Sequence, residues 1–248
     1  MITIITITKD DVNGLAHTLK STRILRSNNF FCQIVIDSSN ETNKVAVNKI
    51  VSDEQNVSYH WIEPKGVSNA FNFGLSKVET EWIWYLNGGD TYNTQIQPYL
   101  LQDILKTTKA QGISFSCYIT DSNNNETILG HPELNNLWPP VYNYLAHPSM
   151  ILRTQILKEV NGFREDFNVA MDGELWFRLF SKPNIVVDLI SIPIARFYNY
   201  GLSSNLKKHA RDVLKIFWIH KYLLMSYGIK VIKKIILAFF HFFKISRH

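Results

Sequence analysis

The chain has 248 residues, of which 46% are hydrophobic, 13% aromatic and 19% charged. This composition excludes a disordered chain, and the length suits one sizeable α/β domain with an appendage rather than two large domains. The net charge of +5 is unevenly distributed, because residues 206–248 contain ten Lys or Arg residues and a single acid, Asp212.

The first half of the sequence alternates between strand and helix patterns. Apolar, β-branched runs predict strands over residues 2–8, 33–36, 57–62 and 82–86, and helices are predicted over 12–26 and 68–78. Asp10 or Asp11 is expected to cap the first helix. Strands that alternate with helices predict a mainly parallel sheet with helices on its faces.

Three of these strands end in polar or glycine-rich turns. They are followed by Asp37, by the turn from Glu63 to Gly66, and by the tetrapeptide from Asn87 to Asp90. In open α/β sheets, ligands bind beyond the carboxyl ends of the strands, so we expect these turns to converge on one site.

The second half is less regular. A strand is predicted over residues 113–120, a turn-rich tip over 121–126 and an irregular loop over 134–146. Asp172 is expected to open a short helix, and further strands are predicted within residues 185–197.

Two cysteines, Cys32 and Cys117, lie in apolar runs that indicate buried strands rather than a disulfide scaffold or a zinc site. A reducing compartment is therefore expected. The sequence begins with a β-branched run, without a cationic region or a small-residue cleavage site, so a secretory signal peptide is not predicted.

The tetrapeptide Asn87-Gly88-Gly89-Asp90 is the most informative stretch. Paired glycines allow the backbone to approach a ligand closely. A carboxylate at a strand end can coordinate a hard divalent cation, with phosphates filling the remaining positions. The alternative interpretation is a tight turn with a capping aspartate.

Two segments resemble a known family: EPKGVSNAFNFG at residues 63–74 and WIWYLNGGD at residues 82–90. They look like the family-2 glycosyltransferases of bacterial polysaccharide assembly, such as those of colanic acid, O-antigen and capsule synthesis. The resemblance extends over roughly residues 1–205 as an ordered series of motifs. It implies a GT-A fold, a Rossmann-like α/β domain in which helices flank a mixed, mainly parallel sheet, with residues 206–248 as a basic amphipathic helical tail.

The resemblance also implies a set of donor-binding residues. Asp37 would recognise the base of the nucleotide, commonly uracil, and Thr6 and Thr8 would lie near the nucleoside. Further donor contacts would come from one helix, from the paired glycines and from a loop that ends the domain: Asn69, Asn72, Gly88, Gly89 and Arg196. Plainer alternatives stay open, because Asp37 suits an Asx turn, threonines suit strands, asparagines can face solvent and the loop can be an ordinary linker.

Asp90 matches the last aspartate of the family's metal-binding motif, which implies Mg²⁺ or Mn²⁺ as the cofactor. Asn87 and Gly89 stand where longer versions of the motif carry further aspartates. The protein would therefore supply little charge to the ion, which would be held mainly by the diphosphate of the donor.

The stretch from Phe167 to Leu179 resembles the aspartate-containing helix start of the family. An inverting transfer needs one base on the acceptor hydroxyl and charge stabilisation on the leaving diphosphate. The resemblance assigns the base to Asp172, with Glu174 as the alternative, and places His147 beside the acceptor. The two acids also suit a helix cap and the positive end of a helix dipole, and His147 also suits the start of a strand.

A helix over about residues 229–245 would place its basic side chains on one side and its apolar side chains on the other. Lys233 and Lys234 interrupt the apolar run, which is shorter than the roughly 20 residues of a spanning helix. In-plane binding to a membrane through residues 229–248 is therefore predicted, and docking on the domain or on a second subunit is the alternative. Nucleic acid is not expected as a partner, because the charge alternates with a continuous apolar face.

Together these features predict an inverting glycosyltransferase, peripheral at the cytoplasmic face of the plasma membrane. It would move a sugar from a nucleoside diphosphate, expected to be UDP, to a saccharide acceptor linked to undecaprenyl diphosphate. The alternative is a non-catalytic, membrane-associated module that binds nucleotide sugars without turnover.

Overall fold

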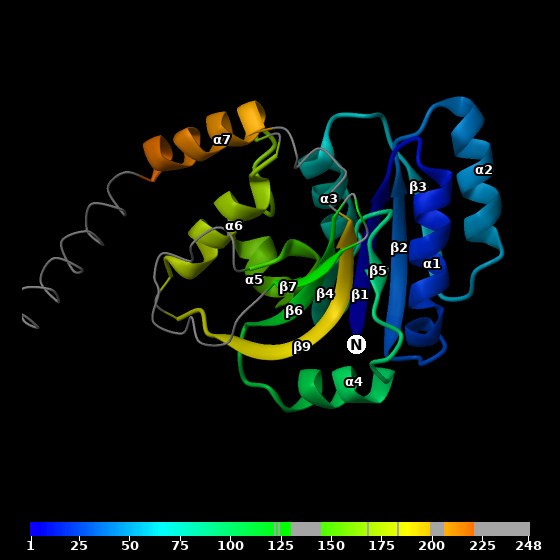
Figure 1. The fold of residues 1–248 in the computed structure, drawn as a ribbon, viewed down its shortest axis with the longest axis horizontal. Helices are drawn as coiled ribbons and strands as arrows, with labels where there is room; N and C mark the ends of the chain where they lie inside the picture. The colour runs from blue at the N-terminus through cyan, green and yellow to red at the C-terminus, as the bar shows by residue number, and fades with distance from the viewer. Residues whose placement is uncertain are drawn as a thin grey trace, which may run out of the picture.

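The computed structural model describes residues 1–121, 123, 125–129, 145–167, 169–182, 184–198 and 206–220. In this part of the chain, helices flank both faces of one mixed sheet (Figure 1), which confirms the predicted α/β class. The strands are β1 (Ile2–Thr8), β2 (Phe31–Asp37), β3 (Val57–Trp61), β4 (Trp82–Tyr85), β5 (Thr91–Tyr92), β6 (Gly112–Thr120), β7 (Glu126–Leu129), β8 (Met150–Arg153) and β9 (Val187–Tyr198). The helices are α1 (Val12–Arg26), α2 (Glu41–Ser52), α3 (Val67–Ser76), α4 (Pro98–Thr107), α5 (Thr154–Glu159), α6 (Met171–Phe180), α7 (Leu206–Ile219) and the 3₁₀ turn η2 (His147–Ser149).

The strands β3, β2, β1 and β4 are neighbours in that order and run parallel. Thr8 lies opposite Asp37, and Asp37 lies opposite Trp61, so the carboxyl ends of these strands share one edge of the sheet. The strands and both helices predicted in this half are confirmed. Asp11 caps α1, since its Oδ1 accepts a hydrogen bond from Gly14 N at 2.8 Å.

The other half of the sheet is mixed. Strand β8 pairs antiparallel with both β4 and β6, while β6 pairs parallel with β9. Residues 185–197, predicted to contain several strands, contribute the single long strand β9. Its pairing continues past Pro193 because the register with β6 shifts between Phe115 and Cys117.

Three helices were not predicted from the sequence: α2, α4 and α5. Helix α2 buries only Val47 and Val51, and α4 begins at a proline and buries Leu101 and Leu105 beyond it. Helix α5 has six residues. The buried residues of α2 and α4 are three or four positions apart, which is helical spacing, but two or three such residues are a short signal, and packing on the sheet stabilises these helices.

The two faces of the sheet carry separate apolar cores. Alternate strand residues point to opposite faces, so Ile5 and Ile83 pack under α3, α5 and α6, whereas Ile4 and Trp84 pack on the other side with α4. Both cysteines are free, with Cys117 buried on β6 and Cys32 half-buried on β2, in line with the expected strands.

Helix α7 lies against α6 at one end of the molecule (Figure 1). Its Ile216 is buried with Phe167, Ala170 and Phe177. The boundary predicted between the domain and the tail, after residue 205, is therefore followed by a helix that packs on the domain. Most of the predicted 134–146 loop, the loop after Arg196 and the amphipathic segment 229–248 lie outside the described residues. Among the helices that are described, none has the length and hydropathy to span a bilayer.

Candidate active site

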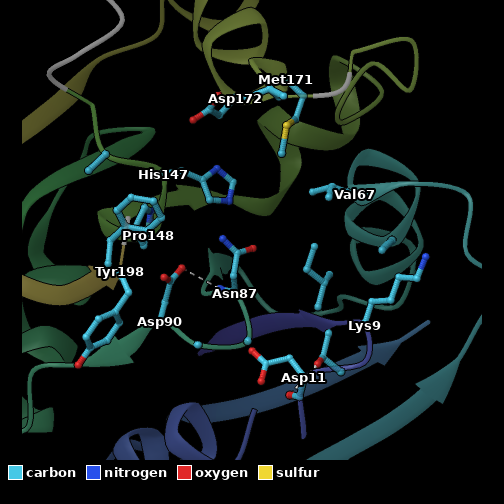
Figure 2. Close-up of a pocket in the computed structure, with 18 of the residues that line it drawn as sticks. Lys9, Asp11, Val67, Asn87, Asp90, His147, Pro148, Met171, Asp172 and Tyr198 are labelled. Atoms are coloured by element: carbon cyan, nitrogen blue, oxygen red, sulfur yellow. Dashed lines mark hydrogen bonds between the residues drawn. The ribbon is translucent and has the colours of Figure 1, made fainter. Parts of the chain in front are cut away.

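A pocket of about 1200 Å³ lies beyond the carboxyl ends of β1 and β4. In Figure 2, Asp172 lies on one side of it and Asp90 on the other, with His147 between them. Its lining includes six of the residues that the sequence assigned to the site: Thr8, Gly88, Gly89, Asp90, His147 and Asp172. Segments far apart in the chain, after β4 and at the start of α6, therefore meet in one cavity.

The turn after β4 depends on both glycines. A side chain at Gly88 would place its Cβ 3.0 Å from the carbonyl oxygen of Ile7, and Gly89 has φ +100°, which favours glycine. Thr18 on α1 holds the turn: its hydroxyl accepts from Gly89 N at 2.9 Å and donates to Asp90 O at 2.6 Å. The turn is thereby fixed by a helix that precedes it by about seventy residues.

Asp90 is buried at the end of this turn, with 4% of its surface exposed. Its Oδ2 accepts a hydrogen bond of 3.3 Å from Asn87 N. Burial raises the pKa of Asp90 to about 7, because the charged form loses its water without gaining a cationic neighbour. A bound cation would therefore stabilise the charged form of this carboxylate.

The residues present fit a divalent cation that is completed by a ligand's own oxygens. Asn87 Oδ1 is buried and has no hydrogen-bond partner among the described residues, and Asn87 lines the pocket with Asp90. Carboxylate and amide oxygens suit Mg²⁺ or Mn²⁺, which commonly take further oxygens from phosphates. In the described part of the chain, no group of three or more His, Cys, Asp or Glu side chains is placed to hold an ion.

Asp172 is the second residue of α6 and is half-buried at the pocket. Its Oδ1 accepts a hydrogen bond of 2.8 Å from Gly173 N, the next residue in the helix. Among the described residues, none donates a hydrogen bond to the other carboxylate oxygen, so it can accept a proton from a ligand hydroxyl.

His147 begins η2 and is 8% exposed. Its ring lies 5.2 Å from that of Phe71 and 5.7 Å from that of Tyr85, centroid to centroid, and neither ring nitrogen has a hydrogen-bond partner in the described structure. Burial lowers the pKa of His147, so the neutral imidazole is favoured. A neutral ring presents one donor and one acceptor to a ligand.

Glu174 does not line the pocket. It is fully buried, its carboxylate accepts from Arg178 Nε at 2.8 Å, and it lies 3.2 Å from His220 Nε2. Burial disfavours the charged form, but the hydrogen bonds from His220 and Arg178 outweigh it and lower the pKa of Glu174. This carboxylate is engaged in joining helices, so we do not retain it as the alternative base.

Two asparagines predicted to contact the donor are also absent from the pocket lining. Asn72 exchanges two hydrogen bonds of 2.8 Å with the backbone of Phe163, and Asn69 donates to Glu165 at 3.2 Å. Both side chains fasten α3 to the segment after α5. These two side chains therefore serve packing, whereas Pro64, Gly66, Val67 and Ala70 of the same motif line the pocket.

The remaining predicted donor residues lie around the pocket but not in its lining. Thr6 is buried and accepts from Gln33 Nε2 at 2.8 Å. Asp37 is buried and accepts from Ser39 N at 2.8 Å and Tyr59 OH at 2.9 Å, while its neighbour Ser38 lines the pocket. Arg196 is ion-paired with Glu126.

Other residues line the pocket without having been predicted. Lys9 and Asp11 directly follow β1, and the rule that placed Asp90 at a strand end would have found them. Ile119, Leu129 and Phe197 form an apolar part of the lining and come from β6, β7 and β9. No local pattern distinguishes them from other strand residues.

Comparisons with known proteins agree with this architecture. The model of glycosyl transferase family 2 matches residues 3–174. An uncharacterised glycosyltransferase of Rickettsia conorii is 22% identical over 214 residues, which cover 82% of this chain and 34% of the relative. An uncharacterised glycosyltransferase of Mycobacterium tuberculosis is 23% identical over 185 residues, covering 71% of this chain and 68% of the relative. The chain thus spans about a third of the length of the Rickettsia relative.

Solved structures share the fold. S. aureus TarS, residues 1–349, in complex with UDP-GlcNAc aligns with a TM-score of 0.62 and 16% identity, covering 81% of this chain and 59% of that chain. The mannosyltransferase PcManGT of Pyrobaculum calidifontis, in complex with GDP-Man and Mn²⁺, aligns with a TM-score of 0.60 and 13% identity, covering 89% of this chain and 64% of that chain.

Proposed function

Because the chain belongs to glycosyl transferase family 2 and is a glycosyltransferase, we propose that it transfers a sugar from a nucleoside diphosphate to an acceptor hydroxyl with inversion at the anomeric carbon. The observation that carries the proposal is that Asp90 and Asp172 line the same pocket. One carboxylate would serve the leaving group and the other the acceptor, as such a transfer requires.

On the leaving-group side, Asp90 and Asn87 would hold Mg²⁺ or Mn²⁺ together with oxygens of the donor. The bound cation would supply positive charge against the departing diphosphate. The two glycines let the backbone of the turn come close to the phosphates, and Lys9 adds a cation among the pocket residues. The structure of PcManGT with Mn²⁺ supports a divalent ion in this role.

On the acceptor side, Asp172 would take the proton from the attacking hydroxyl. His147 would orient that acceptor through a ring nitrogen that has no partner in the described protein. We propose UDP as the nucleotide, supported by TarS in complex with UDP and with UDP-GlcNAc. Asp37 would then recognise the base from its position opposite Thr8, at the carboxyl end of β2.

The acceptor is proposed to be a saccharide linked to undecaprenyl diphosphate, in surface polysaccharide synthesis. The apolar lining formed by Ile119, Leu129 and Phe197 supports an acceptor with an apolar portion. Helix α7 presents exposed apolar residues beside the exposed Arg211, namely Leu214, Phe217 and Trp218. This face supports peripheral attachment at the inner face of the plasma membrane, together with residues 229–248.

The test of the enzymatic proposal is Asp172→Asn. We expect this variant to lose transfer by about 10²- to 10⁴-fold while keeping its affinity for the donor, because only the proton acceptor changes. Glu159→Gln, an exposed change on α5, serves as the control. Transfer is measured as nucleotide release and as glycosylated product, and the product anomer is determined by NMR.

Retention of configuration, or full activity of Asp172→Asn, would contradict the mechanism. Donor binding without any release of nucleotide by the unaltered protein would favour the non-catalytic module instead.

The membrane proposal is tested separately by flotation with liposomes that contain anionic lipid. Removal of residues 229–248 should reduce flotation, and so should the triple substitution Leu214→Ser, Phe217→Ser and Trp218→Ser. Unchanged flotation of both variants would reject the membrane proposal.

A further inference from the structure

Helix α6 carries Asp172 in its first turn, where Asp172 Oδ1 accepts a hydrogen bond from Gly173 N. Its N-cap residue is Ala170, which offers no side-chain hydrogen bond. The first N–H groups of a helix need acceptors, and a segment that leaves them unpaired is held less firmly. The position of Asp172 therefore depends on what the rest of the protein provides at this helix end.

A carboxylate from another helix binds the backbone that leads into α6. The carboxylate of Asp212 on α7 is 2% exposed, and its Oδ2 accepts from Val169 N at 2.8 Å and from Ala170 N at 3.2 Å. These two residues directly precede α6, and Val169 lines the pocket with Met171 and Asp172. Asp212 thus binds the stretch of backbone from which the proposed base projects.

Helix α7 is tied to the same region at further points. Lys215 Nζ donates to Asp166 O at 2.7 Å, and His220 lies 3.2 Å from the buried Glu174 of α6. Ile216 fills the space between Phe167, Ala170 and Phe177. These contacts hold residues 212–220 against α6 and the segment before it, so the Asp212 carboxylate has a defined position relative to the start of α6.

We propose that Asp212 is a positioning residue for glycosyl transfer, which acts by binding, from α7, the backbone that leads into α6 and thereby holding Asp172 at the acceptor. The inference rests on the proposed role of Asp172 as the base. A negative carboxylate at a helix N-terminus both accepts the free N–H groups and interacts favourably with the helix dipole. The proposed donor contacts lie on the other side of the pocket, at the turn after β4, and Asp212 is not part of the pocket lining.

The test compares Asp212→Ala and Asp212→Asn with the unaltered full chain. We expect kcat to fall roughly 10- to 100-fold in Asp212→Ala, since displacement of a catalytic group reduces the rate steeply. The kcat of Asp212→Asn should fall less, because the amide oxygen of asparagine still accepts a hydrogen bond although the side chain carries no charge. The KM and the dissociation constant of the donor should be unchanged in both.

The matched control is Asp188→Ala, which removes an aspartate that accepts from Thr108 Oγ1 at 2.5 Å, outside the pocket lining. It should lower thermal stability without lowering kcat. A merely structural role of Asp212 would instead reduce kcat and donor affinity together, and that result overturns the inference. Unchanged kcat in Asp212→Ala also overturns it.

If Asp212→Ala does not fold, Asp212→Asn decides the question, and a kcat equal to that of the unaltered protein rejects the inference. Asp172→Asn is measured in parallel. Undiminished transfer by Asp172→Asn rejects the proposed function itself. Loss of transfer in Asp172→Asn, with full kcat in both Asp212 variants, rejects only the positioning role.

Discussion

The Asp90 side chain has exchanged water for protein, and hydrogen bonds from Asn87, including one of 3.3 Å from its backbone N, offset only part of that loss. Burial raises its pKa from 3.8 to about 7. Between these two pH values the unfolded chain releases a proton that the folded protein retains. The free energy of unfolding of the metal-free protein should therefore be highest below pH 3.8 and decrease as the pH rises towards about 7.

We expect Asp90→Asn to remove this decline. The variant should gain on the order of 4 kcal/mol in the free energy of unfolding at about pH 8, and little at about pH 4. Urea denaturation of the metal-free proteins at both pH values measures the difference. An equal gain at both would show that burial of the charge is not the cause, and Asp188→Asn provides a comparison outside the pocket.

At the scale of single elements, α1 determines the shape of the turn that carries Asp90. Thr18 bridges Gly89 and Asp90 by its hydroxyl, as described above, and Thr22 lies one turn further along the same helix. Thr22 is equally buried, but its hydroxyl bonds Gln33 Oε1 at 2.7 Å and Thr18 O at 3.0 Å. A comparison of substitutions at the two threonines therefore distinguishes the loss of a buried hydroxyl from a change in the shape of the turn.

Thr18→Val and Thr22→Val should each cost about 1–3 kcal/mol of stability, because each leaves buried polar partners unpaired. Only Thr18→Val should also weaken the binding of a nucleotide sugar with Mn²⁺. Isothermal titration of both variants, alongside denaturation midpoints, measures the two effects. Equal donor affinity in the two variants would mean that the turn keeps its shape without Thr18.

At the scale of the whole molecule, the pocket joins the parallel half of the sheet to the second half of the chain. Thr8 and Asp90 come from the first, whereas His147 and Asp172 come from the second. A ligand that contacts both halves binds only the folded protein. It should therefore stabilise the entire fold by mass action.

A UDP-sugar with Mn²⁺ should raise the melting temperature, and at about a hundredfold excess over its dissociation constant the gain is about 2.7 kcal/mol. The shift should shrink when the metal is removed with EDTA, and Asp90→Asn should abolish the metal-dependent part. Differential scanning fluorimetry measures both. A shift of the same size with EDTA would place donor binding outside the proposed metal site.

The sequence by itself determined the four parallel strands of the first half, the helices α1 and α3, and the convergence of the strands' carboxyl ends. Hydrophobic runs and turn residues are local signals, and parallel strands bring their ends to one edge whatever packs around them. For that reason the Asn87–Asp90 turn could be recognised as part of a site. The family resemblance added Asp172 and His147, which the structure also places in the pocket.

Only the tertiary structure decided which polar side chains reach that pocket. Asp172 and Glu174 are two residues apart on α6, yet one faces the cavity and the other is buried against Arg178 and His220. Which side of a helix is covered depends on partners distant in sequence, here α7. The same holds for Asn72, for Thr18 and for Asp212, because a hydrogen-bond partner dozens of residues away leaves no local pattern in the chain.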